Sequence, residues 1–473
     1  MRVLNPRRVQ PAWFFHRLAT YTFGSRTALR FHSKHCTSTR MASGAHTNFF
    51  AGLPLNRLAW LRTSHPFLNA IVTSSETRWV LFKNGNFLMG SDAEPSSESV
   101  KPKSLILARL TSEDVKPLLG SEPYFAQGKN AGELADSTVA ALESARLHGP
   151  PIAFLGLLEP DTGDRIGNVL PSSEFSAKAD PASIAARIKG SPFFALDVTK
   201  LDKAEVDQVL HACSLAKRGR SLEFIDGRAA MGHLTQVDSA IFAEARTLVD
   251  WNSRIRYCAG CGSPVYSQWA GWKRSCSSLL PWTDNTGKEP CPTATGLHNI
   301  TFPRTDPVVI AVVVSPDNNK IFLGRNQRWP PKFYSALAGF VEPGESLEDA
   351  FERELWEEAA VKVWNIQFHS SQPWPFPANI MAGFYAIADP DVPIKLDLDN
   401  ELEDAKWYTR EEVLAALNSQ ENDPAFKLPP RNALAGVLIR DWAHGRVVVG
   451  GKSQSEVAHH IDEGETKPFR NFF

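Results

Sequence analysis

Apolar and polar residues follow one another along this 473-residue chain in short runs that predict a mixture of strands and helices. The runs Val308–Val314 and Lys320–Leu323 have the length and composition of strands, and a Pro-Asp-Asn-Asn turn joins them. Further on, Leu347, Phe351 and Leu355 repeat at helical spacing, so one side of a helix is expected to pack on a sheet. No apolar run approaches the roughly 20 residues that a membrane span needs, and no membrane contact is expected.

The part of the chain between residues 48 and 250 shows the same mixed pattern. An amphipathic helix is expected at Asp238–Asn252, and three apolar runs have the length of strands: Trp79–Phe82, Ser104–Ala108 and Pro151–Leu158. This region therefore predicts an N-terminal α+β domain. Its residues form no catalytic pattern, which favours a role as scaffold, substrate flank or dimer surface.

Residues 1–40 differ from the rest in composition. They are rich in Arg, Ser and Thr, and the first acidic residue of the chain is Glu76. Such a leader is typical of a mitochondrial transit peptide, although Met41 opens a second plausible start, in which case the leader is not translated. The formal net charge of the chain is only -1, so no global field attracts polyanions and any phosphate must be handled by a local site.

Four of the six cysteines fall within one short segment: Cys258, Cys261, Cys276 and Cys291. The first two form a CxxC pair next to glycines that suit a tight turn. Four thiolates complete a tetrahedral Zn²⁺ shell, so the pattern predicts one structural zinc ion per chain. The alternative is four unrelated cysteines. Cys36 and Cys213 stand alone and are expected to be incidental thiols.

A helix rich in carboxylates carries the sharpest chemical signal. Ser346 is a suitable N-cap, with Asp349 three positions on. Glutamates at positions i, i+3 and i+4 then project from one side of this helix and repel one another unless they share a cation: Glu354, Glu357 and Glu358. Mg²⁺ or Mn²⁺, which prefer oxygen ligands, are the natural occupants. The alternative is a solvated charged face.

The complete spacing, Gly-x5-Glu-x7-Arg-Glu-x-x-Glu-Glu from Gly339 to Glu358, resembles the signature of the Nudix hydrolase family. The family signature continues to a glycine just past the helix, where this chain has Ala360. Alanine in a left-handed helix cap is expected to cost about 1 kcal/mol, unless the turn differs. No ligand is lost, so activity is expected to survive. The resemblance also implies an ion pair between Glu345 and Arg353 that orients the loop on the helix.

The resemblance further implies how the metal is held. Glu354 and Glu358 would be its principal ligands, Glu357 would assist as a ligand or as the base for the attacking water, and Ala338 would offer its backbone carbonyl. Divalent cations would then neutralise a pyrophosphate and activate water for in-line attack, without a covalent nucleophile.

A second motif, SQPWPFP at Ser371–Pro377, closely resembles the one that separates NADH pyrophosphatases from other Nudix enzymes. Its prolines would stiffen a loop in which Trp374 and Phe376 form flat walls for a nicotinamide or adenine ring, while Gln372 would hydrogen-bond to the dinucleotide. The alternative is a rigid, proline-rich partner site. The substrate-binding residues that this resemblance implies are consecutive: Gln372, Pro373, Trp374, Pro375, Phe376, Pro377, Ala378 and Asn379.

Three further positions match the NADH pyrophosphatase pattern. Phe302 stands where relatives carry an aromatic residue that stacks on the substrate base, and Ala435 matches a small residue that contacts substrate. Glu401 would supply one more metal carboxylate beside the substrate, with Glu403 and Asp404 close enough to compete for that role.

These observations predict an N-terminal α+β domain, a four-cysteine zinc knuckle, and a C-terminal Nudix α/β/α sandwich. A possible leader and a C-terminal tail flank these parts. The expected bounds are 1–40 for the leader, 48–250 for the first domain, 251–301 for the knuckle, 302–445 for the Nudix domain and 446–473 for the tail.

The predicted reaction is hydrolysis of the pyrophosphate of NADH or NAD⁺ to NMN(H) and AMP, with removal of NAD caps from RNA as a further activity that the resemblance implies. Alternatives are a Nudix hydrolase for ADP-ribose or another nucleoside diphosphate derivative, and a module that only binds a dinucleotide. Three clustered carboxylates argue against the last. The resemblance also implies a homodimer in the peroxisome or cytosol, whereas residues 1–40, if translated, predict the mitochondrion.

Overall fold

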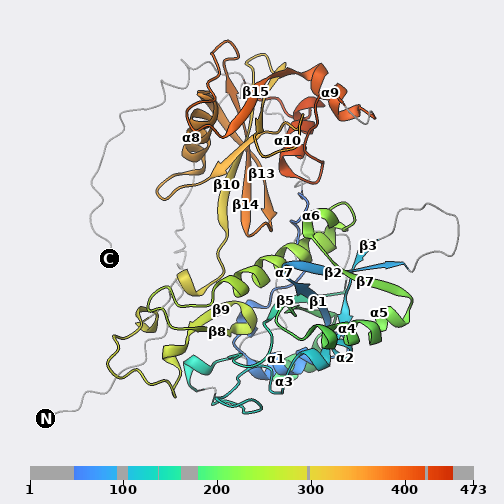
Figure 1. Cartoon of the computed structure of the whole chain (residues 1–473), viewed down its shortest axis with the longest axis vertical. Helices are drawn as coiled ribbons and strands as arrows, with labels where there is room; N and C mark the ends of the chain where they lie inside the picture. The colour runs from blue at the N-terminus through green and yellow to red at the C-terminus, as the bar shows by residue number, and fades with distance from the viewer. Residues whose placement is uncertain are drawn as a thin grey trace, which may run out of the picture. The chain divides into compact units, whose positions relative to one another are not determined.

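The computed structural model describes residues 47–92, 105–136, 138–160, 179–295, 299–420 and 424–450. The predicted leader and most of the predicted tail therefore lie outside the described residues, as does Cys36. Two sheets and a small hairpin follow one another along the described chain (Figure 1). Within these ranges, every helix is too short or too polar to cross a membrane.

The N-terminal half is built on a seven-stranded sheet of order β3-β2-β1-β6-β5, with β4 paired to β1 and β7 paired to β2. β1 and β6 run parallel, while the other pairs are antiparallel. The three strands predicted here are present. The bounds are β1 Arg78–Lys83, β2 Asn86–Asp92, β3 Leu105–Leu107, β4 Leu110–Thr111, β5 Ile152–Leu158, β6 Ser191–Asp197 and β7 Arg220–Ile225.

Helices cover both faces of this sheet. One apolar cluster joins the sheet to α1, α3 and α4, and a second joins its other face to α7. α7 begins at a Thr235 cap and extends the predicted helix by two residues at each end. The predicted α+β domain is confirmed. The helix bounds are α1 His65–Val72, α2 Ser112–Val115, α3 Pro181–Arg187, α4 Lys203–Ala212, α5 Ser214–Lys217, α6 Gly227–Ala230 and α7 Gln236–Arg254.

A two-stranded hairpin follows α7. Its strands are β8 (Val265–Gln268) and β9 (Lys273–Cys276), which pair antiparallel. The side chains buried at its end are cysteines instead of the large apolar residues that fill the two sheets. So small a segment cannot bury a hydrophobic core of its own. Its stability therefore depends on the interaction that holds its cysteines together.

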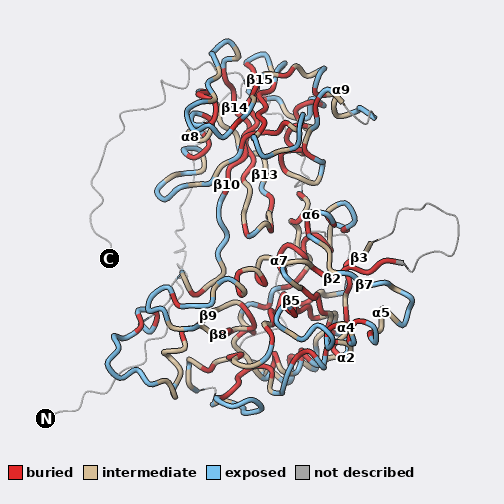
Figure 2. The backbone as a smooth tube through the Cα atoms, viewed as in Figure 1, coloured by how far each residue is buried: buried red, intermediate tan, exposed pale blue. Residues whose placement is uncertain are grey.

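The C-terminal half contains a six-stranded sheet of order β13-β14-β10-β11-β15, with β12 paired to β10. Figure 2 shows buried backbone following its central strands. α8 packs on one face through its apolar stripe, and α9 and α10 pack on the other, so the predicted α/β/α sandwich is confirmed. The bounds are β10 Asp306–Val314, β11 Lys320–Asn326, β12 Leu337–Phe340, α8 Leu347–Ala359, β13 Val363–Trp374, β14 Asn379–Ala388, β15 Leu402–Thr409, α9 Arg410–Asn418 and α10 Leu434–Ala443.

A buried charge ties the N-terminal segment to α7. Glu244, on α7, accepts a hydrogen bond from Arg57 at 2.7 Å, and its second carboxylate oxygen is buried without a partner. The guanidinium of Arg62 lies 3.6 Å from the ring centre of Trp272, which follows the hairpin turn. Burial raises the pKa of Glu244 to about 7, although the charges of Arg57 and Arg62 act to lower it.

This carboxyl makes the stability of the fold depend on pH. Because the folded-state pKa of Glu244 lies above the ordinary value of 4.5, the folded chain binds this proton more tightly than the unfolded chain does. The stabilisation is complete below about pH 4.5 and is lost as the pH rises through 7. Relative to Glu244→Gln, the free energy of unfolding of the wild type should fall by up to about 3 kcal/mol between pH 4.5 and 7.5. Urea unfolding at several pH values tests this, and a pH-independent difference between the two proteins would contradict it.

Candidate active site

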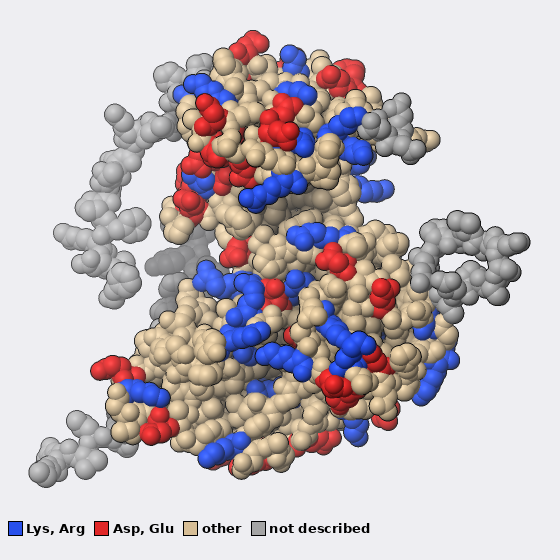
Figure 3. Space-filling model, viewed as in Figure 1, with Lys and Arg blue, Asp and Glu red and all other residues tan. Residues whose placement is uncertain are grey.

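The predicted catalytic helix is α8, and its sequence explains how it is placed. Ser346 and Asp349 form the capping box expected of them, each side chain bonding to the backbone of the other. Phe351 and Leu355 are buried against the sheet. This packing turns the opposite side of the helix, with its glutamates, toward solvent and the candidate site, and Figure 3 shows acidic side chains gathered over α8.

Arg353 holds the loop and the helix together. Its Nε and Nη2 atoms bond to the two oxygens of Glu345 at 2.5 and 3.0 Å, so the ion pair expected from the resemblance is present. Nη2 also donates to the carbonyl of Phe340, and Nη1 lies 3.0 Å from carboxylate oxygens of Glu354 and Glu357. One guanidinium thus partly neutralises three glutamates and pins the preceding loop.

Two backbone positions show why the motif needs particular residues. A Cβ on Gly339 would lie 1.8 Å from the carboxyl carbon of Glu354, so only glycine lets this carboxylate press against the strand. At the other end of α8, Ala360 is the C-cap with φ 54° and ψ 29°. The left-handed turn inferred from the family signature is therefore retained, and alanine carries its steric cost.

Glu358 is the carboxylate most in need of a cation. It is 4% exposed, and no described ion pair reaches it. Burial, together with the charges of Glu401, Glu354, Asp399 and Glu357, raises the pKa of Glu358 to about 9. Oxygen donors crowded in this way suit a hard divalent cation, whose charge would favour the ionised form. The residues present therefore fit the predicted Mg²⁺ or Mn²⁺.

A cavity of about 360 Å³ lies beside these carboxylates. It brings together six of the residues predicted from sequence: Ala338, Glu358, Gln372, Trp374, Glu401 and Ala435. Aromatic walls come from Trp329 and Phe333, whose rings meet edge to face at 5.4 Å. Arg228 and Met231, from α6 and the turn after it, also line the cavity. Sequence reasoning missed these four residues because they stand in no fixed spacing to either motif.

Gln372 plays a different part from the one expected. It is fully buried, and its Nε2 donates to the carbonyls of Phe49 and Asn432 at 2.9 and 3.0 Å. Its Oε1 accepts from the backbone N–H of Leu434 at 2.8 Å. Both amide protons are thus used within the protein, so Gln372 joins three segments of chain and has no donor left for a dinucleotide.

The two aromatic residues of the SQPWPFP motif are also divided between roles. Trp374 ends β13 and lines the cavity, as a substrate wall would. Phe376 instead packs with Phe50 and Phe242 of the N-terminal half, and the guanidinium of Arg228 lies 4.5 Å from its ring centre. The motif thus forms a strand end and a turn, not a loop with two free aromatic faces.

The remaining motif residues lie in the strands around this turn. Pro373 pairs with Ile380 across β13 and β14, and Asn379 begins β14. Pro375 and Ala378 are buried, whereas Pro377 is exposed and follows a cis bond. These residues shape the turn but do not line the cavity. Phe302 is not brought to the cavity either, since its ring lies 5.6 Å from that of Trp269.

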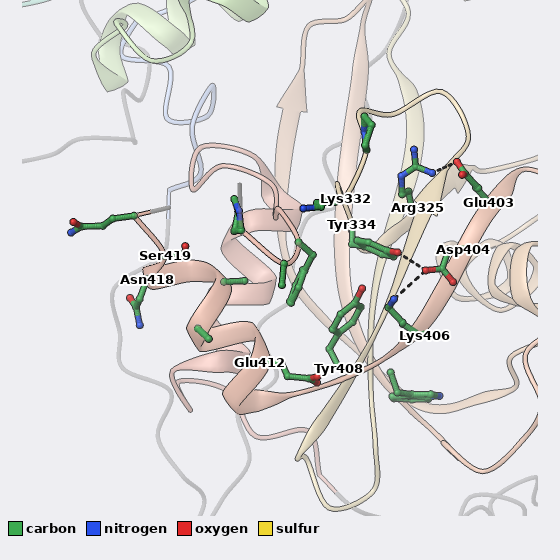
Figure 4. A pocket seen from close by; sticks show the side chains of 18 residues that line it. Arg325, Lys332, Tyr334, Glu403, Asp404, Lys406, Tyr408, Glu412, Asn418 and Ser419 are labelled. Atoms are coloured by element: carbon green, nitrogen blue, oxygen red, sulfur yellow. Dashed lines mark hydrogen bonds and ion pairs between the residues drawn. The ribbon is translucent and has the colours of Figure 1, made fainter. Parts of the chain in front are cut away.

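The structure separates the three candidate carboxylates near β15. Glu401 lines the candidate site and accepts from Asn326 at 2.8 Å. Glu403 and Asp404 line a second cavity, of about 1190 Å³ (Figure 4). There Glu403 pairs with Arg325, while Asp404 binds Tyr334 and Lys406. Glu403 and Asp404 therefore interact with other side chains in a different cavity. The position of Glu401 beside the candidate site favours it as the additional metal carboxylate.

The four predicted cysteines come together at the hairpin. Their sulfurs all lie within 4.8 Å of one another, with Cys258–Cys291 at 3.7 Å and Cys261–Cys276 at 3.4 Å. Disulfide sulfurs would be about 2.05 Å apart, whereas thiolates around tetrahedral zinc are about 3.8 Å apart. The donor set and its spacing therefore fit a closed zinc site. Cys213 is buried away from this group, against the N-terminal sheet.

This combination of sandwich, glutamate helix and glycine loop defines a Nudix hydrolase. Residues 305–428 match the NUDIX domain family, and residues 76–251 match the NADH pyrophosphatase-like rudimentary NUDIX domain. The chain belongs to the Nudix NADH pyrophosphatase family. The predicted fold and enzyme class are confirmed.

Named relatives support the same assignment over most of the chain. NAD-capped RNA hydrolase NUDT12 of Macaca fascicularis is 32% identical over 84% of this chain and 73% of its own length. The NAD-capped RNA hydrolase of Schizosaccharomyces pombe is 33% identical over 85% of this chain and 96% of its own. NAD-capped RNA hydrolase NPY1 of Saccharomyces cerevisiae is 28% identical over 81% and 90%.

The contact between Gly339 and Glu354 gives a direct test of the site. Gly339→Ala should leave the fold intact, because the flexible end of Glu354 can move aside. The displaced carboxylate should nevertheless lower kcat/KM by about 100-fold, as misplacement by about 1 Å can do. Gly232→Ala is the matched control, since its Cβ would meet nothing within 4 Å. Equal rates for the two variants in a pyrophosphatase assay would show that Glu354 does not need this position.

Proposed function

We propose that this protein hydrolyses the pyrophosphate bond of NADH or NAD⁺ to give NMN(H) and AMP, and that it accepts the same dinucleotide as the 5′ cap of an RNA. One observation carries the proposal: a single cavity is lined by Glu358 and Glu401 together with the aromatic rings of Trp329, Phe333 and Trp374. The carboxylates would bind the phosphates through a divalent cation, and the flat rings would stack on the bases. The relatives named as NAD-capped RNA hydrolases support the choice of substrate.

The carboxylates would hold the divalent cation. Glu354 and Glu358 on α8, Glu401 before β15 and the carbonyl of Ala338 are the donors, with Glu357 at the exposed edge. A bound Mg²⁺ or Mn²⁺ would neutralise phosphate oxygens and lower the pKa of the attacking water. Arg353 keeps Glu354 and Glu357 in place before substrate arrives, and Glu357, which is half exposed at 49%, is placed to accept the proton that water loses.

The rest of the cavity would orient the dinucleotide. Trp374 and the edge-to-face pair of Trp329 and Phe333 offer apolar surface on which a base can stack. Ala435 lines the cavity with a small side chain, which leaves room for the substrate that a larger side chain at this position would fill. Gln372 contributes indirectly, by fixing β13 to α10.

Glu358→Gln tests this mechanism. The variant keeps the size of the side chain but removes its charge, so turnover of NADH should fall by at least about 100-fold while NADH binding is retained. Glu348→Gln, an exposed change on the same helix, is the control and should behave as wild type. Chromatography of the products identifies NMNH and AMP, with ADP-ribose as a parallel substrate. Wild-type turnover in Glu358→Gln would refute the mechanism, and preferred cleavage of ADP-ribose would refute the choice of substrate.

We also propose that the four cysteines bind one structural Zn²⁺. Support comes from the mutual approach of their sulfurs and from how few apolar side chains are described around them. The site is closed by four protein ligands, so zinc would stabilise the hairpin and take no part in hydrolysis.

Elemental analysis of the purified chain should therefore find about one zinc per chain. Cys276→Ser should lose this zinc and lower the melting temperature, because the hairpin has no alternative core. Cys213→Ser, which removes a buried thiol outside the cluster, should keep the full zinc content. A wild-type chain that holds no zinc, or a Cys276→Ser variant that holds all of it, would show that the cluster is not a zinc site.

The predicted homodimer stays a prediction of the sequence. The location in the peroxisome, cytosol or mitochondrion also remains a prediction from the sequence.

A further inference from the structure

A separate cavity of about 370 Å³ lies at the C-terminal half of α7, which we call the α7 cleft. It forms where this helix meets the turn between β1 and β2 and the segment that follows β6. It shares no lining residue with the candidate active site. Four cations and two acids line it: Lys200, Arg246, Arg256, Arg274, Asp197 and Asp250.

The cations of the cleft outnumber its acids, and both acids already have partners. Asp250 is bonded to Arg246 at 3.1 Å and to Arg254 at 2.5 Å. Asp197 accepts from the backbone and the hydroxyl of Thr199. Even with both acids ionised, the four cations give the lining of the cleft an excess of two positive charges, in a chain whose formal net charge is -1.

Two of the cations remain available to a ligand. Lys200 is exposed and has no described partner, and Arg256 is exposed and uses only its Nε, which donates to the carbonyl of Ser253 at 3.0 Å. Arg274 is fixed by bonds to the carbonyls of Ile255 and Val265. Burial lowers the pKa of Arg274 to about 10, so it stays charged at neutral pH.

A buried hydrogen-bond acceptor completes the cleft. Asn252 is 5% exposed, and its Nδ2 donates to the carbonyls of Leu248 and Gly271, each at 2.9 Å. These bonds fix the amide so that Oδ1 is the remaining group, and Oδ1 is buried with no partner. A buried acceptor without a partner destabilises the fold, and a ligand that donates a hydrogen bond to it would remove this penalty. The cleft therefore suits a ligand with an anionic group and a hydroxyl or amine donor.

We propose that the α7 cleft binds a nucleotide in the body of a single-stranded RNA whose NAD cap lies in the candidate active site. A phosphodiester supplies the anion, and a ribose hydroxyl or a base amine supplies the donor that Asn252 lacks. The proposal rests on the proposed function for the identity of the cap. Figure 3 shows Lys and Arg side chains gathered over α7, along which such a strand would run.

The length of α7 sets how much RNA is needed. Met231 lines the candidate active site and precedes α7 by five residues. The residues of α7 that line the cleft begin at Arg246. Along the helix, Arg246 lies about 15 Å and Asn252 about 24 Å from the first residue, Gln236. A cap with one or two nucleotides cannot bridge this distance, so the cleft contributes only to longer RNAs.

The double variant Lys200→Gln/Arg256→Gln tests the proposal, with Lys217→Gln/Arg218→Gln as the control because both residues are exposed and lie outside the cleft. Binding of an uncapped, 5′-phosphorylated single-stranded RNA of about 20 nucleotides, measured by fluorescence anisotropy, should weaken about tenfold in the cleft variant only. The slope of log affinity against log salt should fall by up to about 2, one for each phosphate that the variant no longer neutralises. The KM for NAD-capped RNA should rise in parallel, while kcat/KM for NADH and for an NAD-capped dinucleotide should stay within about twofold of wild type.

The outcomes separate this proposal from the function on which it rests. A wild type that binds RNA but does not cleave NADH would refute the proposed function and leave the cleft in place. RNA binding that is equal in the two double variants would refute the proposal that the α7 cleft binds RNA. So would a change in oligomeric state of the cleft variant by light scattering, because the basic residues would then belong to an interface between copies.

Discussion

Repulsion among carboxylates is the constraint on which the candidate active site depends. Four other acidic groups lie near Glu358, and a buried carboxylate among like charges favours its protonated form. Arg353 relieves part of this repulsion, because its guanidinium reaches Glu345, Glu354 and Glu357 at once. It does not reach Glu358, so the site retains an unmet demand for positive charge. That demand links the fold to metal-dependent chemistry.

The two halves of the chain share the work of the site. Gln372 bonds to the backbone of Phe49, and Phe376 packs into the core beside α7, so the strand that follows the Nudix helix is fixed by the N-terminal half. Gly227 is needed at this junction, since a Cβ there would lie 2.5 Å from Phe242 and 3.0 Å from Phe376. The N-terminal half, whose sequence pattern indicates little more than a scaffold, thereby contributes Arg228 and Met231 to the cavity and α7 to the proposed RNA path.

The zinc cluster and the α7 cleft lie on neighbouring pieces of chain. Arg274 belongs to β9, whose last residue is Cys276, and Arg256 stands two residues before Cys258. A metal that stabilises the hairpin would therefore also fix the backbone that carries two cations of the cleft. This gives a closed metal site a physical connection with RNA binding, although zinc itself would touch no substrate.

Local rules were enough to predict much of this protein. Spacing along one helix determines that Glu354, Glu357 and Glu358 share a side, and the Ser346 box determines where that helix begins. The CxxC pair and two more cysteines likewise indicate one donor set. Only tertiary structure decided which side chains still have free polar atoms. The donors of Gln372 bond to distant backbone, and Phe376 packs in a remote apolar core. Glu403 pairs with Arg325 of β11, and Asp404 with Tyr334, which precedes β12. Hydrogen bonding and burial depend on such neighbours, which sequence spacing does not specify.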